Sequence, residues 1–332
     1  MEKSLCLLWA IFLVACSAPT PAPTPTAGAN TSAIPTTTAP QMKSSATSAP
    51  TPQAQSSATS APTPQAQSSA TSMPTTAATP SVPAQTLVVA HRGGAALAPE
   101  NTLAAFANAI KLGVDMVECD VHLSKDGELV VMHDPDVSRT TDGKGQIGEL
   151  TLAEIKKLND AAKFPGGYAA QAVPTLAELL DLVKGKVGIQ IEIKLTAGNQ
   201  RYPGIEHKVV DAVNARGMAD QVIVISFDFP TIKEVKAIDP RIKTGALVQA
   251  NWFQTRALDQ IAKEIIETTG ADYFMPTAGP VNAAMINAVH AGGLKMGVWT
   301  VDAPQDMQRY ASWGVDAITT NRPDELKRVV GK

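Results

Sequence analysis

The chain has 332 residues, of which 28 are basic and 31 are acidic, so its formal net charge at pH 7 is −3. No run of basic residues stands out, and the charge pattern therefore argues against a nucleic-acid partner. Of the three cysteines, two lie near the N-terminus and only Cys119 remains for a folded domain. A disulfide framework is thereby excluded for that domain, which must rely on a large apolar core.

The first sixteen residues resemble a bacterial lipoprotein signal. Lys3 precedes an apolar run over residues 5–15, which is shorter than the about 20 residues that a membrane-spanning helix needs. The run ends in the letters LVAC, a pattern in which the cysteine, here Cys16, is lipidated. We expect residues 1–16 to be a lipoprotein-type signal peptide, so that the exported protein is anchored by lipid to the extracytoplasmic face of the cell envelope. An ordinary cleaved secretion signal or a signal anchor is the alternative.

Residues 17–84 have the composition of a tether. They are rich in Ala, Pro, Ser, Thr and Gln, carry the single charge of Lys43, and repeat the unit SSATSAPTPQAQ at 44–55 and 56–67. Such a chain cannot bury enough apolar surface to offset its ordering entropy. We therefore expect a disordered linker over 17–84 and a folded domain over 85–332.

Strand and helix patterns alternate through the folded domain. The first strand, 87–90, ends at His91, and a helix opens after residue 99 with Asn101 as its expected N-cap. Further parallel strands are predicted at 114–121, 188–195, 222–227, 242–248, 272–276, 295–301 and 317–320. Helical patterns are predicted at 205–216, 230–238, 255–268, 281–290 and 304–313. Eight strands separated by helices predict an α/β fold of the (β/α)8 TIM-barrel type.

One apolar strand, 128–132, breaks this alternation. Only four residues that include an Asp-Gly pair separate it from the strand before it, so the two should form an antiparallel hairpin. The hairpin would bring His133 back beside Glu118 and Asp120.

Three carboxylates near strand ends indicate a metal site. Glu118 and Asp120 are two apart on a strand and point to one face, and Glu192 comes from the next parallel strand. Inward-facing acids repel one another unless a cation compensates, and hard divalent ions such as Ca²⁺ or Mg²⁺ prefer oxygen ligands. We therefore predict a divalent metal ion on these three residues. The alternative is a salt-bridged cluster with Arg92 and Lys194.

His91 and His133 are the acid/base candidates, because imidazole titrates near neutrality. Arg92, next to His91, suits bidentate contacts to phosphate oxygens. The remaining histidines and the cysteine are expected to take no part in the chemistry: His122, His207, His290 and Cys119.

The ordered set of motifs closely resembles the glycerophosphodiester phosphodiesterase family. The matching letters are HRG at 91–93, PENT at 99–102, ECDV at 118–121, KDG at 125–127, VVMHD at 130–134 and EIK at 192–194. Weaker matches follow in SF at 226–227, VWTV at 298–301 and TNRP at 320–323. The resemblance implies a TIM barrel with a small insertion at about 135–173. It also implies a divalent metal held by Glu118, Asp120 and Glu192, and two catalytic histidines, His91 and His133.

The same resemblance implies the reaction, which is metal-dependent hydrolysis of glycerophosphodiesters to sn-glycerol 3-phosphate and an alcohol. One histidine would activate the glycerol 2-hydroxyl for attack on phosphorus, the other would protonate the departing alcohol, and water would open the resulting cyclic phosphate. Lys194 and Arg92 would hold phosphate oxygens. Phe227 and Trp299 would line the glycerol or head-group pocket, or else fill the core.

Two other functions are open at this point. One keeps the chemistry and changes the substrate, as in a lysophospholipase D or a phosphoinositide phosphodiesterase, which an apolar rim at the barrel mouth would favour. The other is a lipoprotein that binds phosphodiesters without turnover. Two proton-transfer groups beside three acids argue against mere capture.

Overall fold

The structure is a computed structural model and describes residues 86–332. The predictions for the signal peptide, for lipidation of Cys16 and for the linker lie outside the described residues. Within the described part, no helix combines the length and the apolar character needed to cross a membrane.

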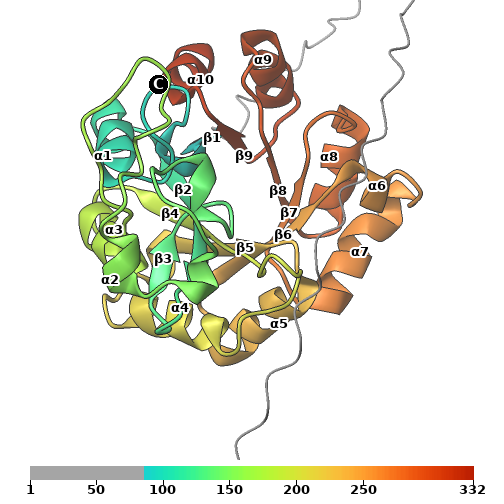
Figure 1. Cartoon of the computed structure of the whole chain (residues 1–332). Coiled ribbons are helices and arrows are strands. Elements are labelled where there is room, and N and C mark those ends of the chain that lie inside the picture. The colour runs from blue at the N-terminus through green and yellow to red at the C-terminus, as the bar shows by residue number, and fades with distance from the viewer. Residues whose placement is uncertain (1–85) are drawn as a thin grey trace, which may run out of the picture. The chain divides into compact units, whose positions relative to one another are not determined.

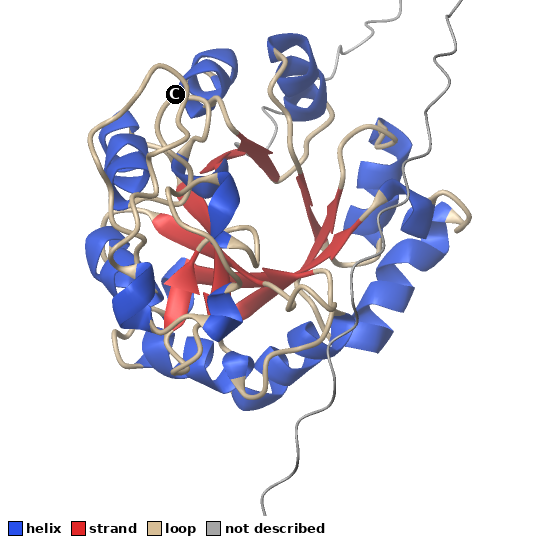
Figure 2. Ribbon diagram, viewed as in Figure 1, coloured by secondary structure: helices blue, strands red, loops and turns tan. Residues whose placement is uncertain are grey.

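Eight parallel strands close into a barrel, which lies inside a ring of helices (Figure 2). The strand order is β1-β9-β8-β7-β6-β5-β4-β2, and pairing of β1 with β2 completes the circle. The strands are β1 (Leu87–Ala90), β2 (Met116–Leu123), β4 (Gly188–Ile193), β5 (Val222–Ser226), β6 (Lys243–Val248), β7 (Tyr273–Pro276), β8 (Lys295–Val298) and β9 (Ala317–Thr320). The predicted (β/α)8 fold is confirmed.

The helices surround the barrel, as Figure 1 shows. They are α1 (Leu103–Leu112), α3 (Leu176–Val183), α4 (Ile205–Asn214), α5 (Phe229–Ile238), α6 (Ala250–Phe253), α7 (Leu258–Thr269), α8 (Ala283–Ala291), α9 (Pro304–Ser312) and α10 (Pro323–Val330), with α2 (Leu152–Ile155) in the insertion. The strands read as nearly continuous apolar runs because parallel strands under helices are buried on both faces. β5, with sequence VIVIS, is buried along its whole length.

Strand β3 (Leu129–Val131) pairs antiparallel with the outer half of β2. The backbone N–H of Met132 then donates to the carbonyl oxygen of Asp120 over 3.0 Å, which carries the chain back to the acids. The predicted hairpin is confirmed, and its return places His133 at the barrel mouth.

An apolar cluster fills part of the barrel interior, and the acids lie beside it at neighbouring register positions of the strands. In the β2–β4 register Glu118 lies opposite Gln190, and in the β4–β5 register Glu192 lies opposite Ile225. Ile225 packs with Leu247 and other apolar side chains. The inner layer is therefore polar on the β2 and β4 side and apolar on the β5 and β6 side.

The insertion has a small core of its own. It contains 3-10 turns at Val137–Arg139 and Ile147–Glu149 together with α2. Val137, Ile147 and Ile155 pack against Val130 and Met132 at the end of the hairpin. The insertion is thereby fixed to the hairpin that carries His133.

Asn101 is not the N-cap of α1, and that prediction is wrong. Thr102 caps the helix, because its hydroxyl accepts the backbone N–H of Ala105 over 3.2 Å. Asn101 instead adopts a positive φ of 58°, and its side-chain amide donates to Asp120 over 2.9 Å. Asn is a common N-cap residue, but Asn101 binds Asp120 of the acid cluster instead.

Several predicted boundaries also differ from the structure. The second strand runs from Met116 to Leu123, two residues later than predicted, and β8 ends at Val298, which leaves Trp299 in a single bridge to Thr277. Helices α2, α3, α6 and α10 were not among the predicted helices. The helix predicted to start at residue 255 starts at Leu258 as α7, because the chain before it forms the separate helix α6.

Candidate active site

A cavity of about 160 Å³ opens at the C-terminal ends of the barrel strands. Eight of the nine site residues predicted in the folded domain line it: His91, Arg92, Glu118, His133, Glu192, Lys194, Phe227 and Trp299. The ninth, Asp120, lies behind them and is 1 % exposed. The structure thus brings together side chains that the sequence spreads over more than 200 residues.

Glu118, Asp120 and Glu192 form a buried acid cluster. One oxygen from each lies within 4.8 Å of the others, so the three could hold a metal ion. Glu118 accepts the backbone N–H of Arg92 over 2.8 Å. Burial raises the pKa of Glu118 well above its usual value, and the charges of Asp120 and Glu192 raise it further.

Two cations contact part of this cluster. The ammonium of Lys194 donates to Glu192 over 2.7 Å and lies 3.4 Å from Asp120, and Nε of Arg92 lies 3.5 Å from Asp120. Burial alone would raise the pKa of Asp120, but Lys194 and Arg92 hold it well below its usual value. Burial raises the pKa of Glu192 to about 7, against the opposing effect of Lys194.

Glu118 is the acid with which neither of these cations forms an ion pair. Among residues 86–332 it forms no ion pair with Lys or Arg within 4.0 Å, and Nε2 of His91 lies 4.0 Å from its Oε2. The salt-bridged alternative therefore accounts for Asp120 and Glu192 and leaves Glu118 without an ion pair to either cation. Oδ1 of Asp120 is also buried without a hydrogen bond. This oxygen-rich set with unused acceptors fits a hard divalent cation.

His91 follows β1 and is held by one ring nitrogen. Its Nδ1 lies 2.7 Å from Oδ1 of Asn321, and the amide of Asn321 donates in turn to Asp302 over 2.7 Å. Burial lowers the pKa of His91, and the charge of Arg92 lowers it further. Both effects favour the neutral imidazole, in which Nε2 is the nitrogen that can accept a proton.

His133, which follows β3 of the hairpin, is likewise held through its Nδ1 nitrogen. Its Nδ1 lies 2.6 Å from Oδ1 of Asp134, and its backbone carbonyl accepts Nε2–H of the buried His122 over 3.0 Å. Burial lowers the pKa of His133, although Asp120 opposes the effect. His122 also bonds the hydroxyl of Tyr202 over 3.0 Å, so it links the backbone of His133 to Tyr202.

Phe227 and Trp299 form one wall of the cavity. Their rings meet edge to face with centroids 5.5 Å apart, and Nε1–H of Trp299 donates to the carbonyl of Met275 over 2.8 Å. Phe227 is 39 % exposed and is thus a rim residue as well. The side chains expected to play no chemical part lie elsewhere: Cys119 is buried in the outer core, and His207 and His290 lie on α4 and α8 away from the cavity.

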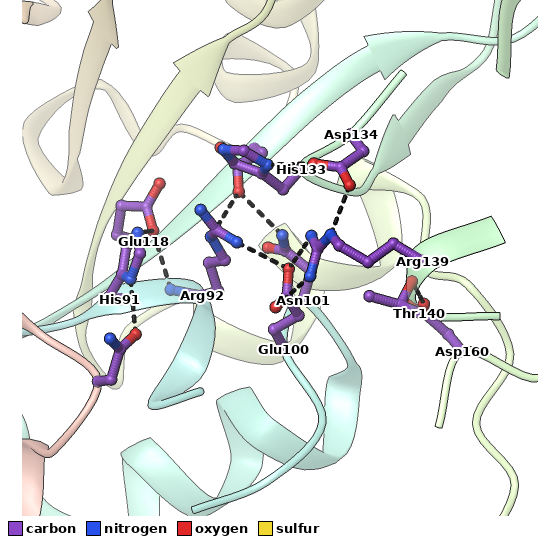
Figure 3. A network of polar contacts seen from close by, with 12 residues as sticks. His91, Arg92, Glu100, Asn101, Glu118, His133, Asp134, Arg139, Thr140 and Asp160 are labelled. Carbon is purple, nitrogen blue, oxygen red and sulfur yellow. Dashed lines mark hydrogen bonds and ion pairs between the residues drawn. The ribbon is translucent and has the colours of Figure 1, made fainter. Parts of the chain in front are cut away.

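Figure 3 shows a polar network around the site that the sequence reasoning missed. Arg92 donates to Glu100 over 2.8 Å, and Arg139 of the insertion contacts both Glu100 and Asp134. Glu100 lies in the PENT motif and Asp134 follows His133, so the motifs contained these acids without indicating their partners. Asn321 lies in the weak TNRP motif, where only the family match marked it.

The fold and the site together define a TIM-barrel enzyme. A model of the glycerophosphoryl diester phosphodiesterase family matches residues 91–325. The chain is 36 % identical over 252 residues to a glycerophosphodiester phosphodiesterase from Caldanaerobacter subterraneus subsp. tengcongensis, covering 75 % of this chain and 99 % of that one. It is 33 % identical over 265 residues to a glycerophosphodiester phosphodiesterase from Bacillus subtilis, covering 74 % of this chain and 87 % of that one.

A solved structure shares the fold and adds a ligand. It is an Oleispira antarctica phosphodiesterase in complex with the product sn-glycerol-3-phosphate, which is 26 % identical, has a TM-score of 0.63, and covers 74 % of this chain and 97 % of that one. This chain belongs to the glycerophosphoryl diester phosphodiesterase family.

Proposed function

We propose that the protein hydrolyses glycerophosphodiesters to sn-glycerol 3-phosphate and an alcohol. The observation that carries the proposal is the meeting of His91, His133 and Glu118 at one cavity beside the other two acids. Membership of the family supports the reaction class, and the product named for the Oleispira relative supports the product.

Glu118, Asp120 and Glu192 are the proposed ligands of a Ca²⁺ or Mg²⁺ ion. Such an ion would supply neutralisation of the phosphate charge and of the charge that develops during the reaction. The buried, cation-poor environment of Glu118 supports this assignment more than it supports a purely salt-bridged cluster.

The two imidazoles are the proposed proton-transfer groups. In each, Nδ1 is occupied by a fixed partner, Asn321 for His91 and Asp134 for His133, so Nε2 is the nitrogen left to exchange protons. One imidazole removes the proton of the glycerol 2-hydroxyl, whose oxygen attacks phosphorus. The other enters the step as an imidazolium, gives its Nε2 proton to the departing alcohol oxygen, and the two exchange roles when water opens the cyclic phosphate.

Lys194 and Arg92 are the proposed phosphate-binding cations, since both line the cavity. The pKa of Lys194 is raised to about 12 because the charges of Glu192 and Asp120 outweigh the effect of burial, so its ammonium is charged at neutral pH. Phe227 and Trp299 supply an aromatic wall for the glycerol or the head group.

The rim favours a small polar substrate over a lysophospholipid. Among residues 86–332, the exposed large apolar side chains are Tyr168, Phe227 and Ile266, and of these Phe227 alone lines the cavity. One exposed ring offers little apolar surface for an acyl chain. We therefore place deacylated glycerophosphodiesters ahead of lysophospholipase D substrates.

A substrate analogue without the 2-hydroxyl tests the proposed chemistry. We expect the protein to release sn-glycerol 3-phosphate from glycerophosphocholine, and to leave the 2-deoxy analogue intact, because the attacking oxygen is missing. Phosphorus NMR of both reactions identifies the products. Cleavage of the analogue at the rate of the natural diester contradicts the cyclic step, and no cleavage of either diester contradicts the activity.

We further propose export and lipid anchoring through Cys16, which the LVAC sequence supports. Changing Cys16→Ser removes the thiol that would accept the lipid. When cells are fractionated, we expect the wild type in the membrane fraction, from which detergent extracts it, and the variant outside that fraction. Retention of the variant in that fraction would favour the signal anchor instead.

A further inference from the structure

We propose that Arg139 of the insertion is a positioning residue that holds His133 and Arg92 in working orientation at the same time. The inference rests on the proposed function of this site and adds a residue to it. Its basis is one guanidinium that bridges two carboxylates, each of which holds a different side chain of the cavity (Figure 3).

The first branch of the bridge leads to His133. Nε of Arg139 donates to Oδ2 of Asp134, whose other oxygen, Oδ1, lies 2.6 Å from Nδ1 of His133. Because both oxygens of Asp134 are used, the carboxylate cannot rotate without losing a contact. The imidazole is therefore held with a proton on Nδ1 and with Nε2 as the nitrogen that exchanges protons.

The second branch leads to Arg92. The two terminal nitrogens of Arg139 donate to Glu100 over 2.9 Å and 2.7 Å, and the same Glu100 accepts from Arg92 over 2.8 Å. Burial alone would raise the pKa of Glu100, but Arg139 and Arg92 lower it, so Glu100 remains a carboxylate. Three nitrogens of one rigid, planar guanidinium thus serve two acids, which a lysine ammonium cannot reproduce.

The backbone at Arg139 is fixed by the insertion. The 3-10 turn Val137–Arg139 is capped by Asp136, which accepts the N–H of Ser138 over 2.8 Å, and Val137 is fully buried. On the other side, the hydroxyl of Thr140 donates to the buried Asp160 over 2.6 Å. A part of the chain outside the barrel therefore supplies a support for the chemistry inside it.

The size of the expected effects separates positioning from stability. The Arg139 side chain is 45 % exposed, and exposed ion pairs add little to the stability of a fold. Misplacement of a reacting group by about 1 Å, in contrast, costs about 100-fold in rate. Loss of Arg139 should therefore change kcat far more than it changes the melting temperature.

The direct test replaces Arg139 by alanine and by lysine. We expect Arg139→Ala to lower kcat by about 10- to 100-fold, with a smaller change in KM and a melting temperature within about 3 °C of wild type. Arg139→Lys should keep the charge without restoring kcat, whereas added guanidinium ion should partly restore the alanine variant. Wild-type kcat in either variant would overturn the proposal.

Lys156→Ala is the matched control. Lys156 also belongs to the insertion and pairs with Glu178 of α3, but it does not line the cavity. We expect near-wild-type kcat for this variant. A loss as large as that of Arg139→Ala would show that general loosening of the insertion is sufficient, and would contradict positioning.

A double-mutant cycle tests whether Arg139 acts through Asp134. We expect Arg139→Ala to cost less in an Asp134→Asn background than in wild type, because the branch to His133 is already impaired. Strictly additive losses would contradict this route.

A readout without catalysis separates failure of this inference from failure of the proposed function. NMR of the imidazole nitrogens should show the proton of His133 on Nδ1 in the wild type and a mixture of tautomers in Arg139→Ala. An unchanged tautomer in the variant would overturn the positioning role even if no substrate were cleaved. A wild-type protein inactive on every glycerophosphodiester would instead contradict the function.

Discussion

Replacing His133 by alanine is expected to lower kcat for glycerophosphodiester hydrolysis by about 100- to 10,000-fold, the usual contribution of a positioned acid or base. His91→Ala should have an effect of the same order, because the reaction needs both proton transfers. Rates of glycerol 3-phosphate release at saturating substrate provide the measurement.

The same variants should remain folded. The side chain of His133 is partly exposed and pairs with Asp134. His122 bonds only the backbone carbonyl of His133, which alanine retains. His207→Ala is the control, because its side chain is 62 % exposed on α4 and does not line the cavity. We expect wild-type kcat for the control. Wild-type kcat in His91→Ala or His133→Ala would remove that histidine from the reaction.

Adding Mg²⁺ or Ca²⁺ to protein treated with a chelator is expected to raise its melting temperature, and to do so more at pH 8 than at pH 5. A ligand at 100 times its dissociation constant stabilises a fold by about 2.7 kcal/mol. The pKa values of Glu118 and Glu192 are raised in the folded state, that of Glu192 to about 7, so above about pH 4.5 these two acids hold protons in the folded protein that they release in the unfolded chain.

The sign of the pH effect follows from this difference. In the metal-free protein, the contribution of these two acids to stability should fall as the pH rises from about 4.5 through 7, because their deprotonation creates repulsion among the buried acids. A divalent ion competes with those protons and should offset the loss.

Two variants make the metal prediction specific. Glu118→Gln should reduce the metal-induced shift in melting temperature and should stabilise the metal-free protein at pH 8, because it removes one of three buried charges that repel one another. Glu264→Gln alters a half-buried acid of α7 that pairs with Arg256, and this variant should keep the wild-type shift. Equal shifts in Glu118→Gln and in wild type would exclude Glu118 as a ligand.

The parts of the fold and site that depend on local pattern were predictable from the sequence. Alternation by two residues placed Glu118 and Asp120 on one face of a strand, and a four-residue link with Asp-Gly made the next strand a hairpin partner. The hairpin then brought His133 to Asp120 and Glu118, which lie thirteen and fifteen residues earlier in the sequence.

The parts that depend on tertiary paths were not predictable. Arg139 and Glu100 are 39 residues apart, and they meet only because the insertion packs on the hairpin. Asn101 has the composition of a helix cap, and nothing local shows that the neighbouring Thr102 takes that role while Asn101 binds Asp120. Asn321 reaches His91 across 230 residues of sequence, because β9 closes the barrel beside β1.

The most direct test of a metal-assisted, two-histidine hydrolysis is the rate of sn-glycerol 3-phosphate release from glycerophosphocholine before and after chelation. We predict release by the purified protein, loss of that activity on chelation, and recovery when Mg²⁺ or Ca²⁺ is returned. A rate that chelation leaves unchanged would contradict the account.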